Sequence, residues 1–363
     1  MLSSLAIKKF RCFRELKLGS TTDSLPRFNV IIGRNNCGKT ALLESIFLLT
    51  GATNPELAVR LNTFRGMSPG ISFNSPEEAW GWLFFDRQVQ DDIEIVGTHG
   101  TKRKESLSMR LVEPQTTTES RNLTKRDVPQ PVSTTTAVRL RELRFELRVS
   151  KGQAVVSRSI FVPGGKMEFQ SGKSIENRIG VFLGTNVINE NENVARFSVL
   201  AQESGRLNEI IEALQSLEPR VTRLELLMTA AGPVIHADVG LSRLIPLPFL
   251  GDGITRVLTV LLAVATVPGG TILIDEIETG LHHSVLPSFW KTIAIAARRA
   301  NVQLFATTHS HECVAAAHEA FNEDHQDDLL VHRLERRDSG EIVSVSFDRE
   351  ALATALELGW EVR

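Results

Sequence analysis

One stretch of this 363-residue sequence has the residue types and spacing of a loop that binds phosphate groups. It runs Gly33-Arg34-Asn35-Asn36-Cys37-Gly38-Lys39-Thr40 and fits the pattern G-x-x-x-x-G-K-(S/T) at every fixed position. The two glycines permit a tight curl in which successive backbone N–H groups point at phosphate oxygens. Lys39 is expected to bind the β- and γ-phosphates of a nucleotide, and Thr40 to supply a hydroxyl ligand for Mg²⁺. The stretch therefore predicts a nucleoside-triphosphate site.

Two adjacent acids follow an apolar run far along the chain. The run is Thr271–Ile274, and the acids are Asp275 and Glu276. A carboxylate at the C-terminal tip of a strand lies in the crevice where α/β proteins bind ligands. We expect Asp275 to hold Mg²⁺ through its water shell and Glu276 to polarise the water that attacks the γ-phosphate. The pair predicts hydrolysis in addition to binding.

Two further motifs suit the same site. His309 ends a third apolar run and is expected to contact the γ-phosphate or the attacking water. Gly251-Asp252-Gly253 opens a helical pattern and offers free N–H groups to a phosphate. Each motif has a plainer interpretation: an ordinary surface histidine, and an ordinary helix N-cap.

These residues need secondary structure to hold them together, and the hydrophobic pattern predicts it. An apolar run at Phe28–Ile32 is typical of a strand buried on both faces, and a helical pattern at Ala41–Leu49 follows the glycine loop. The last third alternates helices with strands, at 253–266, 271–274, 284–299, 302–306 and 311–321, before a β pair at 329–334 and 342–347 and a helix at 349–358. This alternation predicts an α/β fold with a mostly parallel sheet.

The first strands and the middle of the chain have a different pattern, of strands alone. Short β patterns occur at 5–7, 16–18, 92–96, 106–112, 141–150 and 154–162. They predict an antiparallel β lobe and a β-rich insert at 76–199, with a flexible loop at 113–137. An ATPase head would then be split between 1–75 and 200–363, with a helix at 203–217 and a strand at 221–228. Sustained heptads are absent from the sequence, so no long coiled coil is expected.

Composition excludes several classes of protein. The chain carries 41 Lys and Arg against 43 Asp and Glu, and 42% of its residues are apolar. Apolar runs are shorter than the roughly 20 residues of a membrane helix, and the start lacks the layout of a secretory signal. Three cysteines, Cys12, Cys37 and Cys313, show no metal-ligand spacing. We therefore predict a cytoplasmic protein without a membrane partner.

The charge is unevenly distributed. Residues 101–150 hold eleven Lys and Arg against six Asp and Glu, whereas residues 318–363 hold five against twelve. The basic stretch permits DNA binding, which alanine at Lys102, Arg103 and Lys104 would then weaken; an ordinary solvated surface is the alternative. Four aromatic residues, Trp80, Trp82, Phe84 and Phe85, are more typical of a core than of a platform for nucleic-acid bases.

In this order the motifs resemble an ATPase of the ABC superfamily, in its SMC-, RecF- and OLD-like branch. Ile7–Phe13 resembles the Phe-Arg-x-Phe start of the RecF and OLD-like group. Residues 275–282 and 306–310 resemble stand-alone AAA-type ATPases of bacterial phage-defence islands. Gly251–Gly253 stands where the superfamily has its Leu-Ser-Gly-Gly-Gln signature, with glycine in place of the serine. Gln88 and Gln202 are candidates for the glutamine loop of that superfamily.

The resemblance implies a switch made of two chains. ATP and Mg²⁺ would be held by Lys39 and Thr40 of one chain, and Gly251–Gly253 of the other would cap the nucleotide, giving a homodimer or a higher homo-oligomer. Hydrolysis by Glu276 would reopen the dimer. The switch would act on DNA or on a separate effector protein, such as a nuclease, in phage defence or DNA repair.

Two other functions stay open at this point. One is the ATP-binding subunit of a transporter, although the 214 residues between Lys39 and Gly253 are about twice the separation in transporter cassettes. The other is an ATP-dependent scaffold without turnover, against which Glu276 argues, because a pure sensor needs no base.

Overall fold

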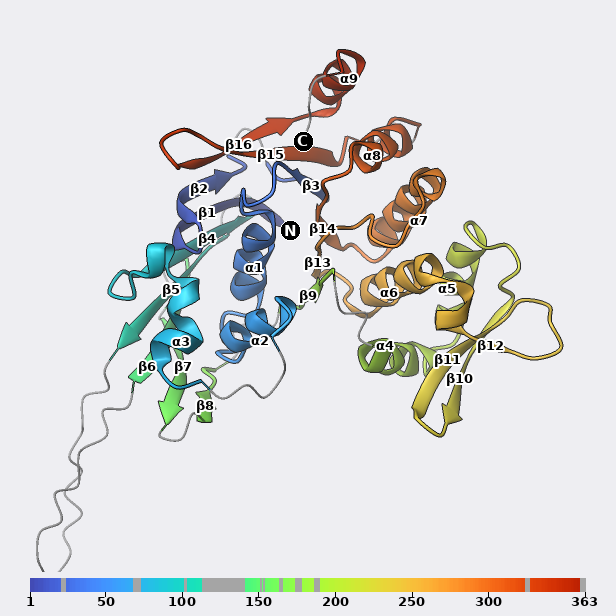
Figure 1. The fold of residues 1–363 in the computed structure, drawn as a ribbon, viewed down its shortest axis with the longest axis horizontal. Helices are drawn as coiled ribbons and strands as arrows, with labels where there is room; N and C mark the ends of the chain where they lie inside the picture. The colour runs from blue at the N-terminus through green and yellow to red at the C-terminus, as the bar shows by residue number, and fades with distance from the viewer. Residues whose placement is uncertain are drawn as a thin grey trace, which may run out of the picture.

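The structure is a computed structural model. It describes residues 1–20, 24–67, 73–100, 103–112, 141–150, 152, 154–162, 166–173, 178–185, 190–323 and 327–359. Within these ranges the strands form three sheets, which Figure 1 shows with the helices that cover them. The predicted loop at 113–137 lies outside the described residues.

The central sheet carries the predicted nucleotide motifs. Its strands, from edge to edge, are β16 (Ile342–Phe347), β15 (Leu329–Arg336), β3 (Phe28–Ile32), β14 (Gln303–Thr307), β13 (Thr271–Ile274) and β9 (Gly180–Leu183). All neighbouring pairs are parallel except β15 and β16, which are antiparallel. Every residue of β3 and β14 is buried, as expected for strands covered on both faces. The predicted α/β class and mostly parallel sheet are confirmed.

Helices cover both faces of this sheet (Figure 1). On one face lie α6 (Asp252–Thr266), α7 (Leu286–Arg299), α8 (His311–Glu323) and α9 (Arg349–Glu357). Alternate strand residues, such as Val30, Ile274 and Ala306, pack into the core on that side. Their neighbours Ile31, Leu273 and Phe305 point to the other face, toward α1 (Lys39–Thr50). Because successive side chains of a strand point to opposite faces, one face of the sheet contributes to one core and the other face to a second core.

The second sheet is antiparallel and covers the opposite side of α1. Its order is β2 (Phe13–Leu18), β1 (Leu2–Phe10), β4 (Ile93–His99), β5 (Arg103–Val112), β6 (Arg141–Val149), β7 (Val155–Val162) and β8 (Lys166–Gln170). Inward residues such as Ile95, Leu107 and Phe145 share a core with α1. Because α1 lies between two sheets, it is buried continuously from Ala41 to Leu49. A helix that is apolar all round suits this position.

The antiparallel lobe and the insert are one sheet. Strands β4 to β8, from the predicted insert, extend the sheet that β1 and β2 begin. Strand β9 also lies within 76–199, yet it pairs with β13 in the central sheet. The division into a head and an insert at 76–199 stays a prediction, but these strand pairings cut across it. A sequence pattern predicts where a strand lies but not which strand it pairs with. The pairing of β9 with β13 was therefore not predicted.

The remaining elements join the sheets. Helices α2 (Leu57–Phe64) and α3 (Pro76–Trp80) follow α1. Helices α4 (Glu190–Ala201) and α5 (Arg206–Gln215) lead into a small sheet of β10 (Arg223–Thr229), β11 (Gly232–Asp238) and β12 (Ile245–Pro246). The helix predicted at 203–217 is shorter, because Gly205, with φ of 83°, separates it from α4.

The longest described helix is α6, with 15 residues, so the described part of the chain has no long coiled coil, as predicted. None of the described helices is both long and apolar enough to cross a membrane.

Candidate functional site

The predicted phosphate loop connects β3 to α1. Gly33, Asn36 and Gly38 have φ of 137°, 63° and 89°, the left-handed backbone that glycine adopts most easily. A Cβ on Gly38 would lie 2.6 Å from the sulfur of Cys12, so neighbouring structure also excludes a side chain there. The ammonium of Lys39 donates to the carbonyls of Gly33 and Arg34 at 2.7 and 3.2 Å. The Lys39 side chain thus lies against the loop to which it contributes a positive charge.

The loop and the acidic strand end meet through a hydroxyl and a carboxylate. Thr40 Oγ1 donates to the two carboxylate oxygens of Asp275 at 3.0 and 3.2 Å. Thr307 Oγ1, at the end of β14, donates to the same carboxylate at 2.6 Å. The carboxylate of Asp275 is thereby fixed by one hydroxyl from the first turn of α1 and one from the end of β14.

Glu276 is held in an unusual backbone conformation. Its φ is 48°, which is rare for a residue with a side chain, and its N–H donates to Thr307 Oγ1 at 2.8 Å. His309 lies beside Glu276: His309 Nδ1 is 3.9 Å from a Glu276 carboxylate oxygen and 3.4 Å from one of Glu278. Glu278 also accepts from the His309 backbone N–H at 3.1 Å, so Glu278 positions the histidine.

A buried arginine on α6 supports the same strand end. Arg256 is 3% exposed and donates to the carbonyls of Gly184, Asp275 and Glu276 at 3.0, 3.0 and 3.4 Å. Its guanidinium therefore ties the end of β13 to the segment after β9 and to the helix that begins near Gly251. Burial lowers the pKa of Arg256, and nearby carboxylates oppose the shift.

An open cavity of about 950 Å³ joins these parts. Of the predicted residues, those that line it are Asn35, Asn36, Gly38, Lys39, Thr40, Asp275 and Glu276. In the described part of the chain, eight non-glycine residues have positive φ, and five of them line this cavity: Arg11, Asn36, Asp86, Arg87 and Glu276. Such conformations gather at functional sites, because only surrounding structure can maintain their strain.

Four predicted residues and one predicted turn are not part of the cavity lining. Gly33 and Cys37 are buried, Arg34 is exposed, and His309 lies 3.9 Å from a carboxylate oxygen of Glu276. Gly251–Gly253 opens α6 and packs against the turn at Gly280, without lining the cavity of its own chain. The glutamine-loop candidates Gln88 and Gln202 do not line it either.

Sequence reasoning missed several arginines of the cavity. Arg11 and Arg65 both pair with the fully buried Glu44 of α1, with N–O distances of 3.0 and 2.8 Å. Arg336, from the end of β15, donates to the carbonyl of Asn36 at 3.0 Å. A charged residue inside the apolar run of α1 was the available signal, since a buried Glu requires a partner.

The charge of this cavity suits a polyphosphate. Four arginines (Arg11, Arg65, Arg87 and Arg336) line it together with Lys39, and Asp275 and Glu276 line it as well. Burial lowers the pKa of Lys39, and neighbouring acidic groups, Asp275 among them, oppose that shift. The Lys39 ammonium lies against the loop, where a phosphate would bind.

The hydroxyl of Thr40 and the carboxylate of Asp275 also fit Mg²⁺. Both are oxygen donors, they already lie within 3.2 Å of each other, and they face an open cavity. Mg²⁺ takes one or two protein oxygens and completes its shell with water and phosphate oxygens. When bound, the metal would neutralise developing charge on the phosphates.

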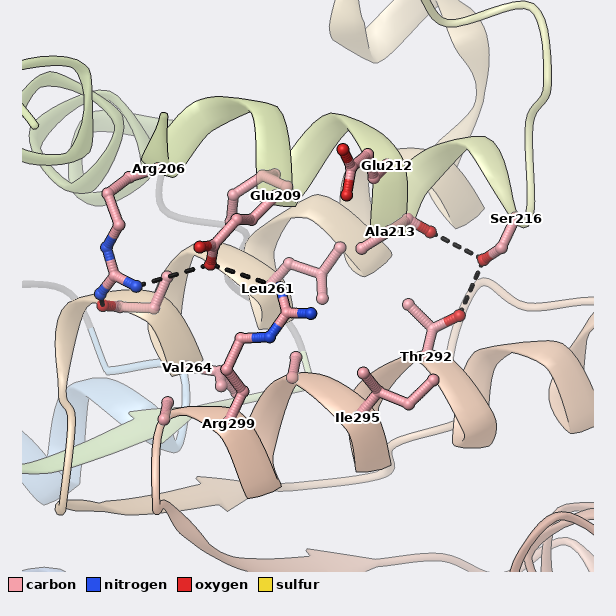
Figure 2. Close-up of a pocket in the computed structure, with 14 residues that line it drawn as sticks. Arg206, Glu209, Glu212, Ala213, Ser216, Leu261, Val264, Thr292, Ile295 and Arg299 are labelled. Carbon is pink, nitrogen blue, oxygen red and sulfur yellow. Dashed lines mark hydrogen bonds and ion pairs between the residues drawn. The ribbon is translucent and has the colours of Figure 1, made fainter. Parts of the chain in front are cut away.

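A second pocket, of about 240 Å³, lies between α5, α6 and α7. Figure 2 shows apolar side chains such as Leu261, Val264 and Ile295 within it, while Arg206 and Arg299 both reach Glu209 at its rim. The two arginines therefore have their carboxylate partner within the pocket. None of the predicted nucleotide residues lines this pocket.

Comparison with known proteins matches the chain to two family models and to a named relative. A family model described as an AAA domain matches residues 4–228. A second, described as "AAA domain, putative AbiEii toxin, Type IV TA system", matches residues 163–315. A protein of Helicobacter pylori named "ATP/GTP phosphatase" is 25% identical over 337 residues, which are 86% of each chain.

The comparison with solved structures matches the chain to SMC heads. An SMC head bound to the C-winged helix domain of ScpA covers 98% of this chain and 99% of its own, at 14% identity and a TM-score of 0.47. The SMC head domain from Thermotoga maritima covers 96% and 99%, at 14% identity and a TM-score of 0.42.

Proposed function

The chain belongs to the AAA-domain family and is an ATPase. From this premise we propose that it is an ABC- and SMC-like switch that closes as a dimer around ATP and Mg²⁺ and reopens on hydrolysis. Lys39 and the loop at 33–40 are proposed to bind the phosphates, and Thr40 and Asp275 to hold the metal. The observation that carries the proposal is the contact of Thr40 with Asp275, at 3.0 Å, beside Glu276.

Hydrolysis needs a water molecule held in line with the bond that breaks and a group that accepts its proton. Glu276 lines the cavity next to Asp275, and its backbone has a strained φ of 48°. We assign it the role of base. His309, 3.9 Å from Glu276 and half-exposed, is proposed to sense the γ-phosphate and to orient Glu276.

Dimer formation is supported by the position of the glycine turn. Gly251–Gly253 begins a 15-residue helix, so its N–H groups form a positive dipole end. Because the turn does not line the cavity of its own chain, its N–H groups would bind the phosphates of an ATP molecule held by a second copy. Arg256 lies one turn along this helix and donates hydrogen bonds to the backbone carbonyls of Asp275 and Glu276. A movement of the helix on closing of the dimer would therefore be transmitted directly to the residues proposed for hydrolysis.

The switch is proposed to control a separate effector protein, in phage defence or DNA repair. Direct DNA binding has less support from the described part of the basic stretch. There Arg110 and Arg148 pair with Glu146, and Arg144 pairs with Glu142, so these arginines are already matched by carboxylates. Lys102 of the predicted DNA contact lies outside the described residues.

The test compares the wild type with Glu276→Gln and Lys39→Ala. We expect Glu276→Gln to bind ATP while its turnover falls by about two orders of magnitude or more, as for loss of a catalytic base. With ATP and Mg²⁺ it should accumulate as a dimer in light scattering after size-exclusion chromatography. Lys39→Ala should lose ATP binding and remain a monomer. Equal, near-zero turnover in wild type and Glu276→Gln would favour a scaffold, and a Glu276→Gln monomer at saturating ATP would contradict the clamp.

A further inference from the structure

An exposed tryptophan lies in the nucleotide cavity. Trp82 is 55% exposed, whereas its neighbours Trp80, Leu83 and Phe84 are 2% exposed or less. It belongs to a short 3₁₀ segment, Gly81–Leu83, and lines the same cavity as Lys39 and Thr40. The expectation that Trp82 is a core residue is therefore wrong. The buried neighbours supply the packing, which leaves the indole of Trp82 open to the cavity.

The surroundings of Trp82 hold it in a defined position. The guanidinium of Arg87 lies over the indole, 4.4 Å from the ring centroid. Arg87 and Asp86 are consecutive non-glycine residues with positive φ, at 56° and 52°, and both line the cavity. Two such residues in succession keep a strained turn that places the guanidinium on the ring.

The same segment is fastened to the turn between β1 and β2. The Arg11 N–H donates to the carbonyl of Leu83 at 2.8 Å, and the Arg11 guanidinium donates to the carbonyl of Trp82 at 3.3 Å. Arg11 in turn is paired with the buried Glu44 of α1, whose first residues belong to the phosphate loop. A chain of contacts thus fixes the indole relative to Lys39 and Thr40.

We propose that Trp82, with Arg87 stacked on it, is the surface that binds the base of the nucleotide. This rests on the proposed function, in which loop 33–40 takes the phosphates. A nucleotide has a flat base at the end opposite its phosphates, and the lining of the cavity contains a flat aromatic and a guanidinium in addition to the phosphate loop. Stacking recognises the face of a base, which all purines share, and does not read its edge. The site therefore accepts ATP and GTP with similar affinity.

The experiment measures binding of ATP, GTP and inorganic tripolyphosphate by calorimetry, in the Glu276→Gln chain to prevent turnover. Trp82→Ala should weaken ATP and GTP about tenfold or more, the usual effect of losing one stacking aromatic, and leave tripolyphosphate unchanged. Trp82→Phe should retain most of the affinity. Phe169→Ala, at an exposed aromatic of β8 outside the cavity, is the matched control.

Unchanged ATP affinity in Trp82→Ala would overturn the base surface. An equal loss for tripolyphosphate would also overturn it, because the residue would then act on the cavity as a whole. Strong discrimination of ATP from GTP by the parent chain would contradict recognition by stacking alone. Failure of the proposed function looks different: the parent chain would bind neither nucleotide nor tripolyphosphate.

Discussion

The hydroxyl of Thr40 donates to both carboxylate oxygens of Asp275, at 3.0 and 3.2 Å, although 235 residues separate them in the sequence. One residue begins α1 and the other ends β13. Their contact closes the site, because it joins the element that binds phosphates to the element that carries the acids.

The first prediction concerns this contact. Asp275→Asn removes one negative charge from the proposed metal site while preserving its shape. We expect ATP turnover to fall on the order of a hundredfold or more, the scale of charge stabilisation by a bound metal, with a higher Mg²⁺ requirement. Turnover across a Mg²⁺ titration measures both effects. Thr40→Ser keeps the hydroxyl and should stay active, whereas Thr40→Val should resemble Asp275→Asn; an active Thr40→Val chain would contradict the assigned metal ligands.

The second prediction concerns the ion cluster beneath the cavity. Glu44 is fully buried and compensates both Arg11 and Arg65. Glu44→Gln leaves two guanidinium groups without their carboxylate, so the free energy of unfolding should fall by about 3–5 kcal/mol. Chemical denaturation measures the change. Glu94→Gln, which breaks a surface pair with Lys8 at 3.9 Å, should have little effect. An equal free energy of unfolding for Glu44→Gln and wild type would show that the ion pairs of Glu44 with Arg11 and Arg65 do not stabilise the fold.

The third prediction concerns acid stability. His332 on β15 is fully buried, and burial lowers its pKa from 6.5 to about 4. The unfolded chain therefore binds a proton at a higher pH than the folded chain does. The stability that the neutral histidine contributes is present above pH 6.5 and is lost as the pH falls toward 4, by about 2 kcal/mol between pH 7 and pH 5.

Denaturation curves at the two pH values test this in wild type and His332→Gln. Ser346 and Asn29 lie 3.0 and 3.2 Å from the ring nitrogens, and a glutamine keeps polar atoms near them. The variant should lose about 2 kcal/mol less than wild type between pH 7 and pH 5. The same loss in both proteins would place the acid sensitivity elsewhere.

The phosphate loop, the acidic strand end and their supporting strands could be predicted because each is a local signal. Phe28–Ile32 and Thr271–Ile274 are short apolar runs bounded by glycine or acids, and the structure places strands at the same residues. Parallel strands bring their C-terminal ends to one edge, so it followed from the pattern that Asp275 and the loop at 33–40 would approach each other.

The parts that could not be predicted depend on long-range pairing. Nothing local distinguishes β9 from the strands of the antiparallel sheet, yet it pairs with β13. Arg11, Arg65 and Trp82 join the cavity because three separate segments meet there: the β1–β2 turn, the end of α2 and the segment after α3. Trp82 illustrates the limit well: its aromatic neighbours Trp80 and Phe84 are buried as expected, and only the turn at Asp86 and Arg87 leaves it exposed.

The position of β3 between β14 and β15 has a consequence for biosynthesis. Residues 28–40 leave the ribosome early, but the strands that flank β3 are not complete until Arg336 has been translated. Until then the nascent loop lacks the neighbours that shape it, and sheets built from such distant segments assemble slowly. A nascent chain that stops before Arg336 should therefore be unable to compete for cellular nucleotide, so that nucleotide binding begins only after β15 has been translated.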